Sequence, residues 1–373
     1  MKSHRENSQT LRLGILGGGQ LARMLALEAH RMGIEPWILS ENKYDPAAQV
    51  SGFWTQGNPS KIDELQKFAD QVDYLTFESE FLDASLLSTL DKPIHPSPAL
   101  MGVLQDRLTQ KNLLLKNKIP TSPFVAVDTF EDLKSAFQRF SKGLVLKKRR
   151  NGYDGYGTFI VRKESELKPL RENLSKEKSG FIAEAFIPFK RELAIILGRD
   201  RTGNSISLPL VESLQTNAKC DWVVGPIKHK KAATVISKIK KMLTQEKYVG
   251  VIGFELFDTG SEILVNELAP RVHNSGHYSQ NALSESQFTL HVKAVCGIEC
   301  DSPTLLAPGF AMANLIGTST QKANWKTDFT SHLHWYGKSE NRPGRKMGHL
   351  NAIAVTGKKA LAQVLKDRKK ISL

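Results

Sequence analysis

The pattern of hydrophobic and polar positions at the start of the chain predicts alternating strands and helices. The apolar run Leu11–Leu16 ends in three glycines, and Gln20–Met32 then repeats apolar residues at helical spacing. Pro36–Leu39 follows as a second short apolar run. Strand, glycine-rich turn, helix and strand in this order are typical of a parallel, doubly wound sheet. We therefore expect an α/β fold that begins with such a sheet.

The same patterns predict a smaller α/β unit next, and then a region rich in strands. Predicted strands are Asp73–Phe77, Phe124–Val127, Gly143–Lys147, Phe181–Phe186, Glu192–Gly198, Ser205–Val211, Gly250–Phe257 and Glu262–Leu268. Predicted helices are Glu80–Leu90, Gln105–Asn117, Thr234–Thr244, Glu285–Val295 and one that the capping box Thr129–Asp132 introduces. From about Asp301 onward the chain is predicted to be β-rich and to end in a basic helix.

Two of these predicted strands place a carboxylate near their C-terminal ends, Glu255 in one and Glu267 in the other. The second strand runs into a polar turn that holds Arg271, His273, Asn274 and His277. Paired carboxylates suit a hard divalent cation, and guanidinium and amide groups suit anionic oxygens. Solvated or salt-bridged acids are the common alternative for such a pair. A zinc site at His273 and His277 is disfavoured, because Asn274 and Gly276 predict a turn instead of a helix.

Composition narrows the class of protein. With 373 residues, 40% hydrophobic and 24% charged, the chain is expected to form two or three packed globular units. No apolar run is long enough for a membrane helix, and the polar first ten residues are expected to be disordered. Three cysteines cannot make a disulfide framework, so we expect a reducing, cytoplasmic location.

The net charge of +14 raises the possibility of nucleic-acid binding. The basic residues are spread along the chain, however, and no DNA- or RNA-binding motif accompanies them. Attraction of small anionic substrates explains the charge at least as well. We therefore expect neither a nucleic-acid partner nor a membrane partner.

The glycine-rich turn Gly17–Ala22 has the form Gly-x-Gly-x-x-Ala, and Glu41 lies at a suitable distance downstream. An NAD-dependent dehydrogenase is a serious alternative on this segment alone. The same turn can hold any phosphate at a helix N-terminus. Gln20 adds a side-chain amide that suits recognition of a polar ligand.

Three further segments carry candidate ligand-binding groups. The loop Asn151–Gly157 contains three glycines and follows four basic residues, and Lys147 ends an apolar strand, where a cation is costly unless it meets an anion. Glu184 and Glu192 would be ordinary salt-bridge partners if taken alone. Near the end of the chain, Lys338 and Arg345 flank a Pro-Gly turn and could hold a phosphate monoester.

Taken together, these segments resemble one family in order and spacing, from about Leu11 to about Val355. The diagnostic segments are Gly14–Leu21, Gln105–Arg107, Gly152–Gly155, Asn266–Arg271, His273–His277 and Arg342–Lys346. They are similar to the 5-(carboxyamino)imidazole ribonucleotide synthases, ATP-grasp ligases of purine biosynthesis. The resemblance implies a Rossmann-like pre-ATP-grasp domain (residues 1–105), an ATP-grasp domain (106–305, with a lid at about 120–185) and a small β-rich C-terminal domain (306–373).

The resemblance also implies the reaction. ATP, bicarbonate and 5-aminoimidazole ribonucleotide (AIR) would give 5-carboxyaminoimidazole ribonucleotide, ADP and phosphate through carboxyphosphate. Mg²⁺, or Mn²⁺ in its place, would be the metal, and the enzyme would be a homodimer.

Site roles follow from the resemblance residue by residue. ATP would be bound by Arg107, Lys147, Glu184, Ala185, Phe186, Ile187, Glu192, Asn266 and Glu267, and the metal by Glu255 and Glu267. AIR would contact Gln20, Tyr153, Asp154, His273, Asn274, Lys338 and Arg345. Arg271, Asp154 and His273 would be catalytic, with Arg271 on bicarbonate or carboxyphosphate.

The chain departs from the family pattern at several positions. Asn151 replaces the first glycine of the loop, and Tyr156 stands where a cation is usual, so the anion grip of this loop needs a substitute such as Arg149 or Arg150. Val272 replaces a common proline, and Ser279–Asn281 replaces Thr-Ile-Asp. The alternative within the class is a formate-dependent glycinamide ribonucleotide transformylase, against which Gln20 argues.

Overall fold

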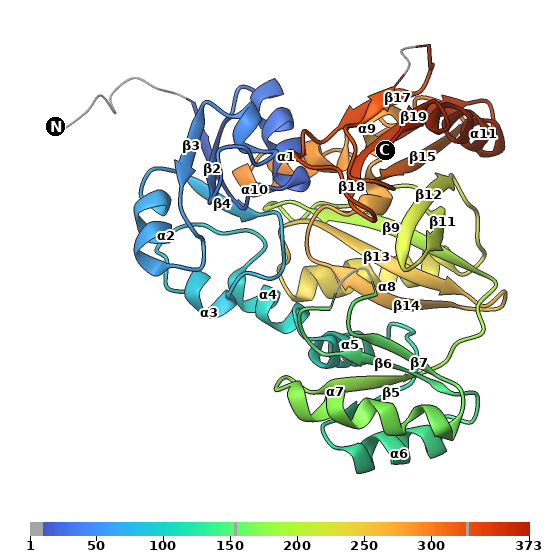
Figure 1. The fold of residues 1–373 in the computed structure, drawn as a ribbon. Coiled ribbons are helices and arrows are strands. Elements are labelled where there is room, and N and C mark those ends of the chain that lie inside the picture. Colours follow the sequence, from blue (N-terminus) through green and yellow to red (C-terminus); the bar gives the residue numbers. More distant parts are fainter. Residues whose placement is uncertain (1–9, 153–154, 326–327) are drawn as a thin grey trace.

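The computed structural model describes residues 10–152, 155–325 and 328–373. The segment 1–9, most of the tail expected to be disordered, lies outside the described residues. Figure 1 shows the N-terminal unit at the upper left, the C-terminal segment at the upper right and a smaller α/β unit at the bottom, with a large sheet running through the middle.

The N-terminal unit is the predicted parallel sheet, with strand order β3-β2-β1-β4. Its elements are β1 (Arg12–Leu16), α1 (Gln20–Arg31), β2 (Glu35–Ser40), β3 (Phe53–Gln56), α2 (Ile62–Ala69) and β4 (Tyr74–Phe77). The predicted helix Glu80–Leu90 is wrong in length: α3 spans only Ala84–Leu87. Asp83 caps it by accepting hydrogen bonds from the backbone of Ser85 and Leu86.

The predicted helix Gln105–Asn117 is confirmed as α5 (Arg107–Lys116), and a short helix that the sequence patterns missed, α4 (Pro98–Leu104), precedes it. Asp106 separates them, because its backbone is extended and its carboxylate accepts a hydrogen bond from Leu108 N. This cap places Arg107 at the first position of α5, at the edge of the cavity described below.

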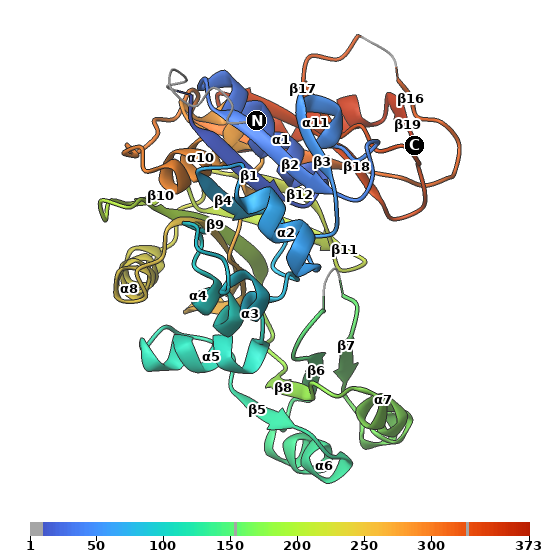
Figure 2. The ribbon, with the colours of Figure 1, turned by 90° about the vertical axis from the view of Figure 1, so that its left-hand side faces the viewer.

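The smaller unit, here called the lid, is an antiparallel sheet with strand order β5-β8-β6-β7. Its elements are β5 (Phe124–Val127), α6 (Phe130–Arg139), β6 (Leu144–Lys148), β7 (Thr158–Val161), α7 (Arg171–Lys176) and β8 (Phe181–Ala185). The predicted capping box is confirmed at α6: Thr129 Oγ1 accepts from Asp132 N, and the Asp132 carboxylate accepts from Thr129 N. Figure 2 shows both lid helices on the outer face of this sheet.

The central sheet has nine strands in the order β14-β13-β9-β11-β12-β15-β18-β17, with β10 paired to β9. Its strands are β9 (Arg191–Arg199), β10 (Ser205–Ser207), β11 (Val211–Thr216), β12 (Lys219–Gly225), β13 (Gly250–Asp258), β14 (Ile263–Ala269), β15 (Gly309–Ile316), β17 (His332–Trp335) and β18 (Lys346–Ala354). Helices α8 (Ala232–Gln245), α9 (Ser279–Ala282), α10 (Gln287–Cys296) and α11 (Gly357–Arg368) cover it, and β16 (Asn324–Trp325) pairs with β19 (Ile371–Ser372).

One predicted strand, Ser205–Val211, proved to be two. β10 ends at Ser207 and β11 begins at Val211, and between them lies Pro209, which has no backbone N–H to donate to a ladder. The strand β12, which the sequence patterns missed, then returns beside β11 as a hairpin. β12 also pairs with β15, so a single sheet continues from the central region into the C-terminal segment.

The core fills both faces of this sheet. On one face, α10 packs against α1 and β13, and Phe288, Leu290 and Val292 are buried in the shared cluster. On the other face, α8 packs against β9 and β10 and buries Ile239 and Met242. Among the described residues, no helix has both the length and the apolar character needed to cross a membrane.

Candidate active site

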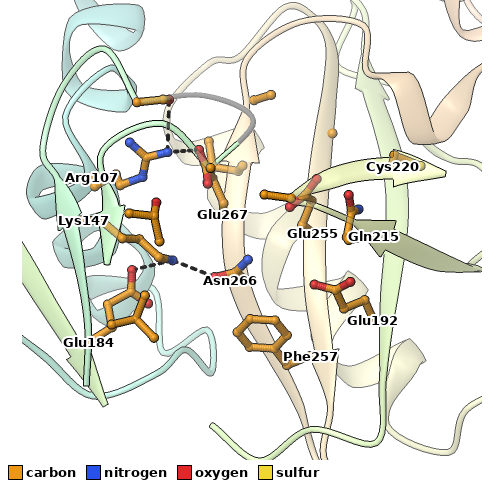
Figure 3. A pocket seen from close by; sticks show the side chains of 18 of the residues that line it. Arg107, Lys147, Glu184, Glu192, Gln215, Cys220, Glu255, Phe257, Asn266 and Glu267 are labelled. Atoms are coloured by element: carbon orange, nitrogen blue, oxygen red, sulfur yellow. Dashed lines mark hydrogen bonds and ion pairs between the residues drawn. The ribbon is translucent and has the colours of Figure 1, made fainter. Parts of the chain in front are cut away.

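A cavity of about 350 Å³ lies between the lid and the central sheet. Figure 3 shows Arg107, Lys147 and Glu184 on one side, with Glu192, Gln215 and Glu255 opposite. Thirteen predicted site residues line it: Arg107, Lys147, Glu184, Ala185, Phe186, Ile187, Glu192, Glu255, Asn266, Glu267, Arg271, His273 and Asn274. Gln20, Lys338 and Arg345 are absent from its lining, and Tyr153 and Asp154 lie outside the described residues.

At the lid end, one buried carboxylate holds two ammonium groups. Glu184 Oε1 lies 2.9 Å from Lys147 Nζ, and Glu184 Oε2 lies 2.8 Å from Lys111 Nζ. Ser122 Oγ donates a third contact to Oε2 at 2.5 Å. Burial alone would raise the pKa of Glu184, but Lys147 and Lys111 hold it well below its usual range. The carboxylate is therefore ionised and fixes Lys147 at the cavity wall.

Lys147 also reaches across to the central sheet, because its Nζ donates to Asn266 Oδ1 at 3.0 Å. Asn266 lies on β14, next to Glu267. Two aromatic rings, Phe189 and Phe257, stack at 4.6 Å between centroids and line the cavity near Ile187. This region offers apolar ring surface beside a fixed cation, which suits a flat base attached to an anionic chain.

The carboxylate pair is confirmed as a geometric pair. Glu255 on β13 and Glu267 on β14 are direct cross-strand partners. Burial, followed by the charges of Glu267 and Glu192, raises the pKa of Glu255 to about 7. Glu267 Oε1 accepts from Arg107 Nη2 at 2.7 Å. The sheet thus concentrates negative charge that a hard divalent cation would relieve.

Zinc is not favoured by the geometry. His277 is buried, its Nδ1 lies 3.0 Å from Gln287 Nε2, and its ring lies 4.9 Å from that of His349. His273 lies 3.6 Å from Glu255, but within the described ranges no group of three or more His, Cys, Asp or Glu side chains is arranged for a metal ion. Two carboxylates would leave most of a Mg²⁺ shell to water and phosphate oxygens, as is usual for that ion.

The polar turn after β14 is held by partners that the sequence did not reveal. Arg271 forms a bidentate ion pair with Glu80, in which Nη2 lies 3.0 Å from Oε1. Asn274 exchanges two amide hydrogen bonds with Asn314 of β15, at 3.0 and 2.7 Å. Burial, with Arg271 nearby, lowers the pKa of His273 to about 3, so this imidazole is neutral at pH 7.

The glycine-rich turn before α1 is already filled by a side chain. Glu78 Oε1 accepts from Gly19 N at 2.5 Å, and Glu78 Oε2 accepts from Ala22 N at 3.2 Å. A pyrophosphate would need the same N–H groups. This geometry argues against the dinucleotide-binding alternative, and Gln20 stands beside an internal carboxylate at the start of α1.

The basic turn Arg342–Lys346 lies at the C-terminal side of the cavity, which Lys346 lines. Burial, with Arg345 nearby, lowers the pKa of Lys338 to about 8, and Glu78 partly offsets this effect. Arg345 Nη1 donates to Glu340 O at 3.0 Å. Lys338 therefore carries its charge between the basic turn and the glycine-rich turn.

Arg149 and Arg150, the expected substitutes for the cation missing at Tyr156, both contact Asp106. Arg149 Nη2 lies 2.6 Å from Asp106 Oδ2, and Arg150 Nε lies 3.7 Å from the same atom. Lys148 pairs with Glu177 at 2.8 Å and lies 4.9 Å from the Tyr156 ring centroid. Asp106 thus pairs with both arginines, and their role as a substitute for the missing cation stays a prediction.

Sequence patterns missed several residues of the site: Glu78, Glu80, Lys111, Gln215, Phe257 and Lys346. Glu78 and Glu80 follow the predicted strand at Asp73–Phe77, and acids at the end of a parallel strand were a usable signal. Lys111 lies inside a helix, where a lysine usually faces solvent, so nothing local marked it.

Comparison with known proteins agrees with this architecture. A model described as ATP-grasp domain matches residues 112–288, and one described as ribonucleotide synthetase preATP-grasp domain matches residues 10–105. A third, described as phosphoribosylaminoimidazole carboxylase C-terminal domain, matches residues 311–363. Fold and site together define an ATP-grasp ligase.

Individual relatives narrow the assignment. The N5-carboxyaminoimidazole ribonucleotide synthase of Synechococcus elongatus is 35% identical over 351 residues, covering 91% of this chain and 88% of that protein. The chain belongs to the N5-carboxyaminoimidazole ribonucleotide synthase family, another name for the family whose motifs it resembles.

Solved structures agree. The Staphylococcus aureus N5-carboxyaminoimidazole synthetase complexed with ADP superposes with a TM-score of 0.88 at 28% identity, covering 97% of this chain and 98% of that chain. The Aspergillus clavatus synthase, in complex with ADP and 5-aminoimidazole ribonucleotide, gives a TM-score of 0.84 at 26% identity, covering 96% and 99%.

Proposed function

We propose that this protein carboxylates the amine of AIR with bicarbonate at the expense of ATP, in purine biosynthesis. A bicarbonate oxygen attacks the γ-phosphorus, the bond to the β-phosphate oxygen breaks, and ADP and carboxyphosphate form. Carboxyphosphate gives phosphate and CO₂; the amine nitrogen bonds to the CO₂ carbon and loses a proton. The observation that carries the proposal is the single cavity that joins fixed cations, paired carboxylates and the Arg271 turn.

ATP is proposed to bind along the lid side. Lys147 and Arg107 point their cations into the cavity and would bind phosphate oxygens. The Glu184 carboxylate already holds two lysines, so at the Glu184–Ile187 strand end the backbone would meet the adenine. Glu192, half-buried on β9, would accept hydrogen bonds from the ribose hydroxyls.

Mg²⁺, or Mn²⁺ in its place, is proposed to bind Glu255 and Glu267. The fit rests on the donor set: two facing carboxylates, one with its pKa raised to about 7 by burial and by its neighbours. The metal would neutralise charge on the phosphoryl group being transferred. Arg107, paired with Glu267, would keep that carboxylate oriented.

The carboxylation end is proposed to lie between the Arg271 turn and the basic turn. Arg271, held by Glu80, would bind bicarbonate and carboxyphosphate, and neutral His273 with Asn274 would contact AIR. Lys338 and Arg345 would bind the AIR phosphate, with Gln20 also on AIR. Tyr153 and Asp154, which lie outside the described residues, are also proposed to contact AIR.

Three further expectations belong to the proposal: a homodimer, a cytoplasmic location and the domain limits 1–105, 106–305 and 306–373. The three cysteines are free and buried, which suits a reducing compartment.

ADP release from purified protein tests the function, with Mg-ATP present and AIR and bicarbonate added singly and together. We expect turnover that requires AIR and rises with bicarbonate. Turnover with formate and glycinamide ribonucleotide would identify the transformylase instead. ATP binding with no dependence on AIR would contradict the proposed substrate.

A further inference from the structure

One wall of the cavity is the hairpin formed by β11 and β12. Gln215, Ala218 and Cys220 of this hairpin line the cavity. Its turn residues Asn217 and Ala218 have φ values of 51° and 58°, a left-handed pair that is typical of a tight two-residue hairpin. The tip approaches the glycine-rich loop closely, because a Cβ on Gly155 would lie 2.5 Å from Ala218 Cβ.

The next residue of the hairpin, Lys219, reaches the basic turn. Its Nζ donates to Gly344 O at 2.9 Å. Gly344 N donates to Gly317 O at 2.8 Å, and Arg345 N donates to Arg342 O at 3.0 Å. Gly344 O and Arg345 N belong to the same peptide plane. The ammonium group therefore helps to fix the plane from which the Arg345 side chain extends.

Lys219 differs from the cations around the loop Asn151–Gly157, because those cations are each paired with a carboxylate. Lys148, Arg149, Arg150 and Arg107 each form an ion pair with a carboxylate. Within residues 10–152, 155–325 and 328–373, no carboxylate forms an ion pair with Lys219. Its ammonium has three donors, and Gly344 O uses one. Positive charge therefore remains between the loop and the basic turn.

We propose that Lys219 is a positioning residue for the nucleotide substrate: it fixes the Arg342–Lys346 turn and supplies positive charge that the loop lacks at Tyr156. The inference rests on the proposed function, since it takes the anion at the basic turn to be the AIR phosphate. It predicts a role in AIR binding and none in ATP binding, because Lys219 is absent from the cavity lining.

Steady-state kinetics of Lys219→Met and Lys219→Arg test the inference. The matched control is Lys240→Met. Lys240 lies on α8, outside the cavity lining, and its Nζ also donates to a backbone carbonyl, Ser205 O, at 3.0 Å. We expect Lys219→Met to raise KM for AIR about tenfold, the usual order for losing a charged hydrogen bond. KM for ATP should stay within about twofold, and Lys219→Arg should restore most of the AIR affinity, because a guanidinium keeps charge and donors.

Three results would overturn the inference: an unchanged KM for AIR in Lys219→Met, an equal rise in KM for ATP, or the same kinetic change in Lys240→Met. If Lys219→Met does not fold, Lys219→Gln takes its place, because its amide is uncharged yet polar. AIR-dependent turnover of the unaltered protein is measured first. Its absence would refute the proposed function, whereas normal turnover with an unaffected Lys219→Met would refute only the role of Lys219.

Discussion

At the lid end of the cavity two lysines share a buried carboxylate, whereas Lys338 and Arg345 at the other end form no ion pair with a described carboxylate. Glu184 forms ion pairs with both Lys111 and Lys147 inside a buried cluster. Among the described residues, no carboxylate forms an ion pair with Lys338 or Arg345. The lid end is therefore fixed before a ligand arrives, and the basic turn keeps positive charge for one. Fixed cations suit phosphoryl transfer, which depends on placement, and uncompensated cations suit capture of a dianion.

Replacement of Glu267 by Gln should have the largest effect. It removes a proposed metal ligand and the ion pair with Arg107, so we expect kcat to fall by at least about 10³-fold. ADP release under saturating substrates measures this loss. Glu262→Gln, at an exposed salt bridge just before the same strand, is the control and should retain full activity. Near-normal kcat in Glu267→Gln would remove the carboxylate pair from the proposed mechanism.

Replacement of Lys111 by Met tests the buried ion-pair cluster around Glu184 directly. It removes one of the two ammonium groups on a buried carboxylate and leaves Glu184 Oε2 with the Ser122 hydroxyl as its partner. Breaking a buried ion pair costs about 3–5 kcal/mol of the free energy of unfolding. Urea denaturation followed by circular dichroism measures it. Lys134→Met, at the exposed pair with Glu131, should change stability by less than about 1 kcal/mol. Equal stabilities of the two variants would contradict the comparison between the two ends.

Replacement of Lys338 by Met tests the other end. Losing a cation that meets a phosphate should raise KM for AIR by roughly 10- to 100-fold, while KM for ATP stays within about twofold. Because no described carboxylate depends on Lys338, stability should change little. Parallel thermal melting and initial-rate measurements separate these two quantities. A large loss of stability without a change in KM for AIR would mean that Lys338 stabilises the fold and does not bind the AIR phosphate.

The pH dependence of AIR use should show a smaller effect. Burial, with Arg345 nearby, lowers the pKa of Lys338 to about 8, so the ammonium is present at pH 7 and mostly lost at pH 9. The value of kcat/KM for AIR should therefore fall by up to about tenfold over that range, because it reports the free enzyme. Lys338→Arg stays protonated and should flatten the decline. An unchanged decline in that variant would exclude Lys338 as its cause.

Features encoded within a few residues were predictable from the sequence. The capping box at Thr129, the parallel opening sheet and the facing pair Glu255 and Glu267 all depend on local patterns or on consecutive strands. The resemblance to the synthase family was confirmed by relatives and by solved structures. Most of the residues predicted for the site line one cavity, and their individual roles stay predictions.

Features that depend on distant segments were not predictable. Lys111 lies on α5 and Glu184 lies on β8, 73 positions further along the chain, so no periodic pattern in the sequence connects them. Glu80 reaches Arg271 across 191 positions. The predicted helix Gln105–Asn117 begins at Arg107 in the structure, because the extended cap residue Asp106 left no mark in the apolar pattern. The hairpin that carries Lys219 lacked the Gly that usually marks such a turn.

The glycine-rich turn before α1 shows how one distant side chain changes the use of a common backbone shape. Glu78, 59 positions beyond Gly19, docks its carboxylate on the amides that a bound cofactor would otherwise occupy. The turn therefore connects the end of β4 to the start of α1 and does not serve as an anion-binding site. Replacing Glu78 with a small neutral residue would free these backbone amides to bind an anion. The N-terminal unit would then be a starting scaffold for new anion sensors.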